Sequence, residues 1–174
     1  MKREVYLILD NIRSRENVGS IFRTADAVGV SKIFLCGITP RPFRSLGVGG
    51  RPEYDPKISK TALGAETYVP WEYYTQTWKV LRKLKVESGK LKVVGLEQAK
   101  NSQNIFQYKP QFPLALVVGN EVRGISSRIL KYCDETVQIP MLGKKESLNV
   151  SVATGVALYT LMYGPDLLPR RSRG

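Results

Sequence analysis

Histidine is absent from this sequence of 174 residues, and its absence restricts the chemistry that the chain can perform. Without imidazole there is no Ser-His-Asp or Cys-His nucleophile system, no histidine-ligated zinc and no histidine general base. Any reaction must therefore use Arg, Lys, carboxylates, hydroxyls, amides or a bound cofactor.

Cysteines and long apolar runs are also scarce. Cys36 and Cys133 lie far apart, without CxxC spacing and in or beside apolar segments, as is typical of reduced, buried thiols. No apolar run approaches the roughly 18 to 20 residues of a membrane-spanning helix. The first residues, MKREVYLILDN, lack the apolar core and cleavage site of a signal peptide. We therefore expect a cytoplasmic protein without a membrane partner.

Acidic residues are few relative to basic ones. Lys and Arg number 27 against 15 Asp and Glu, which gives a formal net charge of +12. Such a balance favours an anionic partner, nucleic acid before a membrane surface, although a basic surface can also serve solubility alone. With 43% hydrophobic residues, the chain is long enough for one domain, which we expect to span 1–174.

Apolar runs of strand length alternate with helical patterns along the chain. In the first third, strand 5–10 is followed by a helix from Asn17 that ends at Gly29, and then by strand 32–36. Further buried strands are expected at 91–96 and 114–118, with a short helix over 125–132. The pattern predicts an α/β fold with a mostly parallel sheet flanked by helices.

Two segments interrupt this rhythm. Residues 39–65 are rich in Pro, Gly and basic residues and predict a long basic loop with one helical turn, either contacting nucleic acid or disordered. After it we expect a short strand at 67–69 and a helix over 71–86.

The stretch 136–162 predicts a strand, a Gly/Lys loop and an apolar helix. Ser147, Asn149 and Ser151 lie where that helix is expected to begin. Ser and Asn favour helix starts, because their side-chain oxygens can accept hydrogen bonds from the unpaired first-turn amides. A loop that leads into a helix N-terminus can hold a polar ligand. The alternative interpretation is a capped, buried helix with no ligand.

Three segments together carry a specific signal. The first is Asn17-Val-Gly-Ser-Ile-Phe-Arg23, which places an amide and a guanidinium six residues apart on one helix; the others are Gly119-Asn120-Glu121 after a strand and Ser147-Leu148-Asn149-Val150-Ser151 at the last helix. Their order and spacing closely resemble motifs 1, 2 and 3 of the SpoU/TrmH family of the SPOUT class. These are S-adenosylmethionine-dependent RNA ribose 2′-O-methyltransferases. The resemblance runs from about Val5 to Met162.

The resemblance implies a fold that periodicity cannot reveal. Family members have a deep C-terminal trefoil knot, here expected at about 91–165, and they form homodimers through it. Three loops of the knot hold S-adenosylmethionine, with apolar side chains around the adenine. The cofactor-binding residues implied for this chain are Leu96, Glu97, Gly119, Asn120, Ile139, Met141, Ser147, Leu148 and Asn149.

The resemblance also implies catalytic residues. It assigns Arg23 to act on the ribose hydroxyl, with Asn17, Glu121, Ser147 and Asn149 shaping the site. A guanidinium is an awkward base because its pKa lies above about 12. Arg23 fits better as a group that stabilises the developing alkoxide, with the proton lost to phosphate or water. Because the sulfonium becomes neutral on methyl transfer, no metal or redox cofactor is needed.

The expected function is methylation of a ribose 2′-hydroxyl in RNA, tRNA before rRNA. The preference for tRNA rests on the expected lack of a separate N-terminal RNA-recognition domain. The alternatives are an rRNA 2′-O-ribose methyltransferase and a non-catalytic RNA-binding protein of the same fold. The intact set of Arg23, Asn17, Glu121, Ser147 and Asn149 favours the enzyme.

Overall fold

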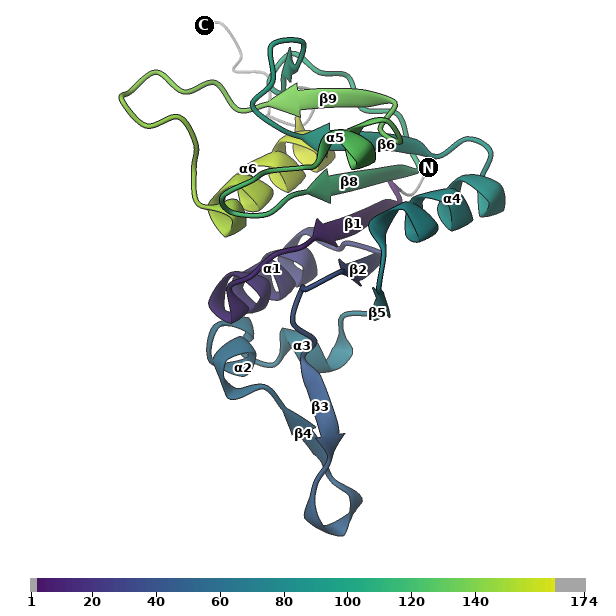
Figure 1. The fold of residues 1–174 in the computed structure, drawn as a ribbon, viewed down its shortest axis with the longest axis vertical. Coiled ribbons are helices and arrows are strands. Elements are labelled where there is room, and N and C mark those ends of the chain that lie inside the picture. Colours follow the sequence, from purple (N-terminus) through teal and green to yellow (C-terminus); the bar gives the residue numbers. More distant parts are fainter. Residues whose placement is uncertain (1–2, 165–174) are drawn as a thin grey trace, which may run out of the picture.

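A parallel sheet of seven strands organises the computed structural model, which describes residues 3–164 (Figure 1). The strand order is β5-β2-β1-β8-β6-β9-β7, and all neighbouring pairs are parallel. The strands are β1 (Val5–Asp10), β2 (Lys32–Cys36), β5 (Trp71–Tyr74), β6 (Lys92–Leu96), β7 (Gln103–Asn104), β8 (Leu114–Val118) and β9 (Glu135–Gln138). The sheet confirms the predicted α/β class. The trefoil knot stays a prediction, and Pro165, the last residue of the expected knot, lies outside the described residues.

Helices cover both faces of the sheet (Figure 1). One face carries α1 (Arg15–Val28) and α6 (Val150–Tyr163), with α2 (Pro56–Ala62) and α3 (Ala65–Tyr68) beyond them; the other carries α4 (Thr77–Glu87) and α5 (Ser127–Leu130). Along β1, Leu7 and Leu9 join the core on the α1 side, whereas Ile8 joins the core on the α4 side. Because the central strands are buried on both faces, they read as continuous apolar runs.

The prediction of a long basic loop over 39–65 is wrong, although the helical turn predicted within it is present. This segment forms an antiparallel hairpin of β3 (Phe43–Leu46) and β4 (Pro52–Tyr54), followed by α2. A 3₁₀ turn, η1 (Val48–Gly50), lies at the tip of the hairpin, which extends away from the sheet at the bottom of Figure 1. Asp55 caps α2 by accepting from the Lys57 and Ile58 amides. An Asp before a Pro is a helix-start signal that the surrounding prolines and glycines obscured.

The next two elements are shifted along the chain. The strand expected at 67–69 is wrong, because this segment belongs to α3 and its end, and the edge strand β5 starts at Trp71 instead. The helix expected from Trp71 begins only at Thr77. The aromatic residues of β5 are half-buried at the edge of the sheet. A short run of this kind does not distinguish a strand from the first turn of a helix, which is why the predicted helix began too early.

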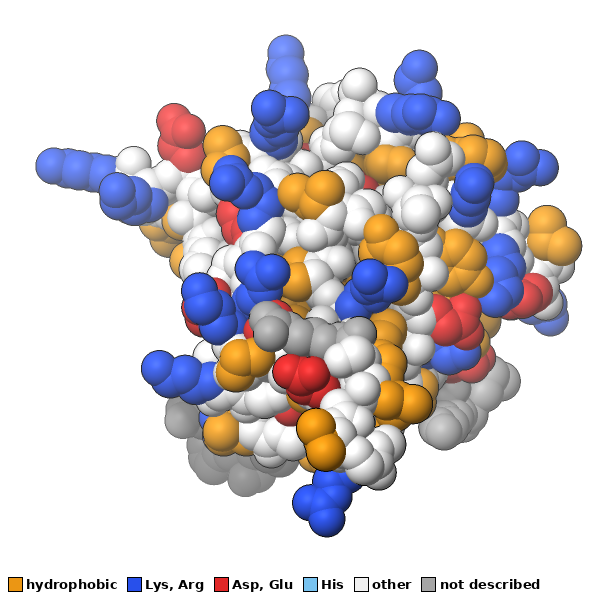
Figure 2. All heavy atoms as spheres, turned by 60° about the horizontal axis from the view of Figure 1, so that its bottom comes forward, with side chains coloured by type: hydrophobic (Ala, Val, Ile, Leu, Met, Phe, Trp, Pro, Cys, Tyr) orange, Lys and Arg blue, Asp and Glu red, His pale blue; other side chains and the backbone are white. Residues whose placement is uncertain are grey.

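Basic side chains are spread over one face of the molecule (Figure 2). On the face shown in Figure 2, Lys and Arg are spread widely, with fewer Asp and Glu among them. No helix among residues 3–164 combines the length and apolar character needed to cross a bilayer.

Candidate functional site at the carboxyl edge of the sheet

A pocket opens where β6, β8 and β9 end. Leu96 pairs with Val118 on one side and with Val137 on the other, so the loops that follow these strands leave the sheet side by side. The carboxyl edge of a parallel sheet is the usual place for a ligand site. The pocket has a volume of about 250 Å³. We call it the edge pocket; its lining is Leu96, Glu97, Gln98, Val118, Gly119, Asn120, Glu121, Val122, Gly124, Gln138, Ile139, Glu146, Ser147, Leu148, Val150 and Ala153.

Beside the edge pocket, a chain of side-chain hydrogen bonds joins the three motif segments. Asn17 Nδ2 donates to Glu121 Oε1 at 3.2 Å, and Asn149 Nδ2 donates to Asn17 Oδ1 at 3.1 Å. Asn149 Oδ1 in turn accepts from the Ser151 amide at 2.9 Å. Residues more than 100 positions apart in the sequence thus form one polar junction between α1, the turn after β8 and α6.

The two helices of the junction begin at capping residues. Ser14 caps α1 by accepting from the Asn17 amide, so the helix starts at Arg15, two residues before the predicted start. Asn149 caps α6, which starts at Val150, as the cluster of Ser and Asn at this point indicated. Both caps place polar groups at the first turns of two helices that pack against each other.

Glu121 anchors the start of α1. Its carboxylate accepts from the Arg13 amide at 2.9 Å and from the Ser14 amide at 2.9 Å, in addition to the Asn17 side chain. Partial burial alone would raise the pKa of Glu121, but these donors outweigh it and hold the pKa below its ordinary value. The charged form of this carboxylate is therefore favoured.

The turn from Gly119 to Gly124 is tightly braced. A Cβ added at Gly119 would lie 2.3 Å from the Gly124 carbonyl carbon, and Gly124 itself has a φ of +64°. Glu97 Oε2 accepts from the Ile125 amide at 2.6 Å. Asn120 Oδ1 accepts from the amides of Val122 and Arg123, while its Nδ2 donates to the Asn11 carbonyl. Side chains on both sides thus fix the position of this turn.

The charge of the edge pocket is opposite to that of the whole chain. Its lining includes the carboxylates of Glu97, Glu121 and Glu146, and no Lys or Arg among the described residues. Apolar atoms of Leu96, Ile139 and other residues supply the rest of its walls. An apolar pocket with several carboxylates suits a ligand that has a flat apolar part and a positive charge.

Most residues that the sequence pointed to meet at this site. Leu96, Glu97, Gly119, Asn120, Glu121, Ile139, Ser147 and Leu148 line the edge pocket. Asn17 and Asn149 adjoin it through the hydrogen bonds to Glu121. Met141 does not line it.

Several lining residues were not foreseen. Val118 and Gln138 end strands, so the rule that ligands bind at the carboxyl edge could have found them. Gln98, whose Nε2 donates to the Ile139 carbonyl at 2.7 Å, and Glu146 carry no such signal.

Arg23 lies apart from the edge pocket of its own chain. It is six residues beyond Asn17, which on a helix means about 9 Å along the axis and a different face. Its side chain is exposed, does not line the pocket, and has no ion-pair partner in the described part of the chain. Asp26, three residues further along α1, accepts from the Tyr68 hydroxyl at 3.2 Å. Thr24, the residue after Arg23, faces Gly155, so this part of α1 packs against α6.

Metal-binding geometry is not found among residues 3–164, where no three His, Cys, Asp or Glu side chains come together. Burial raises the pKa of both cysteine thiols to about 12, so they are poor ligands and poor nucleophiles.

The fold is similar to that of solved SPOUT-class methyltransferases. The SpoU methyltransferase AviRb from Streptomyces viridochromogenes, crystallised with its cofactor AdoMet, superposes with a TM-score of 0.76 at 28% identity, over 91% of this chain and 60% of that chain. The TrmH/SpoU tRNA-modifying enzyme of A. aeolicus has a TM-score of 0.73 at 30% identity, over 91% and 73% of the two chains.

The sequence profile of the SpoU rRNA methylase family matches residues 4–159, so the chain belongs to this family. The curated 23S rRNA (guanosine-2′-O-)-methyltransferase RlmB of Ralstonia nicotianae is 33% identical over 95% of this chain. RlmB of Photorhabdus laumondii is 37% identical over 88% of it. The chain spans 61% and 57% of the lengths of these two relatives.

Proposed function

We propose that this protein binds S-adenosylmethionine in the edge pocket and transfers its methyl group to a ribose 2′-hydroxyl of RNA. The observation that carries the proposal is the edge pocket itself. It collects three carboxylates and no cation from the described residues of a chain whose net charge is +12, and the three family motifs meet beside it. A basic RNA-binding protein without a cationic small-molecule ligand has no need of such a pocket.

The lining fits the proposed methyl donor. When bound, S-adenosylmethionine supplies an electrophilic methyl group on a positively charged sulfur. Apolar Leu96, Ile139 and Leu148 suit its adenine, and the carboxylates of Glu121 and Glu146 suit its positive charge. The backbone of the braced 119–124 turn offers amides and carbonyls at a fixed position, which favours orientation of the donor.

The chain's own residues then prepare the acceptor side. Glu121 fixes Asn17, and Asn17 fixes Asn149, so the starts of α1 and α6 are held together beside the pocket. Arg23 stabilises the alkoxide that develops on the ribose, while the proton leaves to phosphate or water. Ser147 lines the pocket directly before this junction and contacts the donor or the ribose.

Arg23 is proposed to act in the edge pocket of a second copy of the chain. The support is the surface beside it, because α6 is apolar on all sides. Val152 is 52% exposed and Tyr159 is 48% exposed, and Val156 is only partly covered. A helix with such a composition is normally buried, so we propose a homodimer that pairs through α6.

The dimer is tested by placing a charge on the exposed side of α6. Val152→Glu is expected to give a monomer in sedimentation experiments, with loss of methyl transfer, since a charge cannot be buried there without a partner. Val86→Glu is the matched control, because Val86 is 85% exposed on α4 and lies outside the proposed interface. A Val152→Glu protein that remains dimeric and active would contradict this interface.

Two RNA classes are candidates for the substrate. A solved structure described as giving insight into 2-OH methylation of C/U34 on tRNA has a TM-score of 0.73 at 25% identity, and the similarity covers 95% of that chain, which supports tRNA. The RlmB relatives, named for 23S rRNA, support rRNA. We place tRNA first, because the similarity extends over nearly all of the neighbour described for tRNA, and we expect the reaction in the cytoplasm.

Transfer of tritium from methyl-labelled S-adenosylmethionine to total tRNA and to rRNA, in separate reactions, tests the function. Label recovered as a 2′-O-methylated nucleoside from one class identifies the substrate. Calorimetric titration with S-adenosylmethionine is the second measurement. An RNA-binding protein without catalysis would give no binding heat and no label in either RNA.

A further inference from the structure

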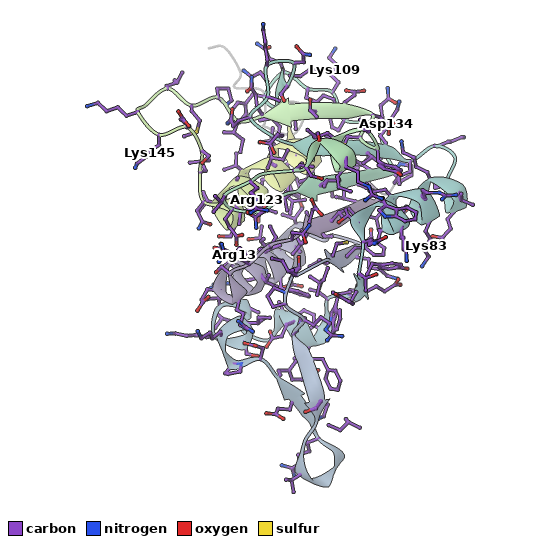
Figure 3. All side chains as sticks on the ribbon, viewed as in Figure 1. Arg13, Lys83, Lys109, Arg123, Asp134 and Lys145 are labelled. Carbon is purple, nitrogen blue, oxygen red and sulfur yellow. The ribbon has the colours of Figure 1, made fainter. Side chains whose placement is uncertain are left out.

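A second cavity lies on the other side of the 119–124 turn. It has a volume of about 620 Å³ and opens at the ends of β1 and β8. Arg13 and Arg123 line it, and both side chains are exposed. Figure 3 labels both on the same side of the molecule, at the end of the sheet where the 139–149 loop extends. We call it the side cavity; its lining is Asp10, Asn11, Arg13, Ile38, Asn120, Val122, Arg123, Gly124 and Ser126.

The acidic residue that lines the side cavity, Asp10, already accepts hydrogen bonds from its neighbours. Asp10 is only 2% exposed, and its carboxylate accepts from the Thr77 hydroxyl and from Asn11 Nδ2. Neither Arg13 nor Arg123 forms an ion pair within residues 3–164. The accessible charge of the side cavity is therefore positive, in contrast to the edge pocket.

Three further cations gather around one indole ring. Lys79 Nζ and Arg82 Cζ each lie 5.8 Å from the Trp78 ring centroid, and Arg128 Cζ lies 6.0 Å from it. The charges are thus at most about 12 Å apart, so they repel one another at low ionic strength, where the screening length exceeds this distance. Cations that share one aromatic ring without an acid between them leave their charge available to an anion.

Other cations of the same helix are neutralised, which sets this cluster apart. On α4, Lys83 contacts Glu72 and Glu87, and Lys85 contacts Asp134 at 2.8 Å. None of the three cations around Trp78 has an ion-pair partner in the part of the chain that the structure describes. The acids near α4 therefore pair with Lys83 and Lys85 and leave the three cations around Trp78 without an acidic partner in the described part of the chain.

The cluster continues directly from the side cavity. Thr77, the first residue of α4, donates to Asp10 in the cavity wall. On α5, Ser126 lines the cavity and caps the helix, and Arg128 follows two residues later. The starts of α4 and α5, the two helices that carry the Trp78 cluster, thus adjoin the side cavity. We call the cations of the cavity and of the cluster together the basic track and define it as Arg13, Arg123, Arg128, Arg82 and Lys79.

We propose that the basic track binds the sugar–phosphate backbone of the RNA next to the target nucleotide. The proposal rests on the function proposed above, and it extends that function by assigning the path of the substrate. Because the side cavity and the edge pocket share the 119–124 turn as a wall, RNA on the track passes beside the donor. Phosphates relieve the repulsion among unpaired cations, and guanidinium groups bind them in a bidentate manner.

Paired charge-removing variants test the track. Arg82→Gln/Arg128→Gln removes two cations around Trp78, while Lys100→Gln/Lys109→Gln removes two exposed cations elsewhere. In Figure 3, Lys109 lies away from Arg13 and Arg123 of the track. Each protein is titrated into labelled, unfractionated tRNA at several salt concentrations. Because backbone contacts carry no sequence information, this probe serves even if rRNA is the substrate. Thermal unfolding of each variant checks that the fold is retained.

The track variant is expected to bind the RNA about tenfold more weakly, and the slope of log affinity against log salt should fall by about two. Donor affinity and kcat at saturating RNA stay unchanged, whereas KM for RNA rises. The control should match the unmodified protein. Unchanged RNA affinity in the track variant, or an equal loss in the control, overturns the proposal. Lack of methyl transfer by the unmodified protein counts against the proposed function alone, because RNA affinity tests the track separately.

Discussion

The edge pocket and the side cavity are neighbours on one edge of the same sheet, yet they carry opposite charge. The edge pocket has Glu97, Glu121 and Glu146 and no cation among its described lining residues. The side cavity has Arg13 and Arg123. The net charge of a chain therefore says little about a particular site, because a single turn suffices to separate an acidic pocket from a basic one.

The largest expected effect comes from a residue that lies in neither pocket. Arg23→Ala should lower turnover by about 100- to 1,000-fold, as loss of a group that stabilises a developing oxyanion does. Donor affinity, measured by calorimetry, should remain near normal, since Arg23 does not line the edge pocket of its own chain. Lys109→Ala serves as the control for loss of an exposed cation. Full activity of the Arg23→Ala protein would contradict the proposal that this guanidinium stabilises the developing alkoxide.

The next largest effect is expected from salt, which should weaken RNA binding far more than donor binding. About five phosphate contacts on the basic track predict that RNA affinity falls by several hundredfold between about 50 and 200 mM salt. Donor affinity should change far less over the same range, because the charges of a small ligand held in a pocket are screened less than those along an exposed surface. Parallel titrations with tRNA and with S-adenosylmethionine measure both. Equal salt dependence for the two ligands would contradict the assignment of the cavities.

The pH dependence of the free energy of unfolding tests the role of the Glu121 carboxylate in the edge pocket. The folded protein lowers the pKa of Glu121 below its ordinary value of 4.5, so this carboxylate stabilises the fold above pH 4.5 and loses that effect as the pH falls through the folded pKa. Glu121→Gln should therefore unfold more easily than the unmodified protein at neutral pH, and the gap should narrow at about pH 3. Urea unfolding at the two pH values measures it. A gap of constant size would show that the charge of Glu121 is not what stabilises the junction.

The smallest effect is expected at the rim of the edge pocket. Glu146 is exposed, so Glu146→Gln should weaken S-adenosylmethionine binding by only about twofold to fivefold. Binding of S-adenosylhomocysteine, whose sulfur is uncharged, should change less. Calorimetry with both ligands gives the comparison. A larger effect on S-adenosylhomocysteine would argue that Glu146 contacts a part of the ligand other than the sulfonium.

Sequence patterns predicted the centre of this fold better than its periphery. The apolar runs of β1, β2 and β8 are buried on both faces, so composition alone revealed them. The β3–β4 hairpin is exposed, and its proline and glycine residues conceal the pairing of two short strands. An element that is not packed into the core leaves little hydrophobic pattern to read.

The candidate site was predictable to a similar extent. Family motifs brought Asn17, Glu121 and Asn149 to attention, and the structure joins them by hydrogen bonds. The contrast in charge between the two cavities was not predictable. It depends on which side of the 119–124 turn each side chain takes, and only the folded turn determines this. The position of Arg23 outside the edge pocket of its own chain also depends on the packing of α1 in the fold.

The side chain of Asn120 has one further consequence. It lines both cavities, and its amide holds the turn that faces the donor on one side and carries Arg123 on the other. If a ligand moved this braced turn from one side, it would also move it on the opposite side, and the affinities for the proposed donor and for RNA would then be linked. Such linkage is reciprocal: whatever factor the donor adds to RNA affinity, RNA adds to donor affinity.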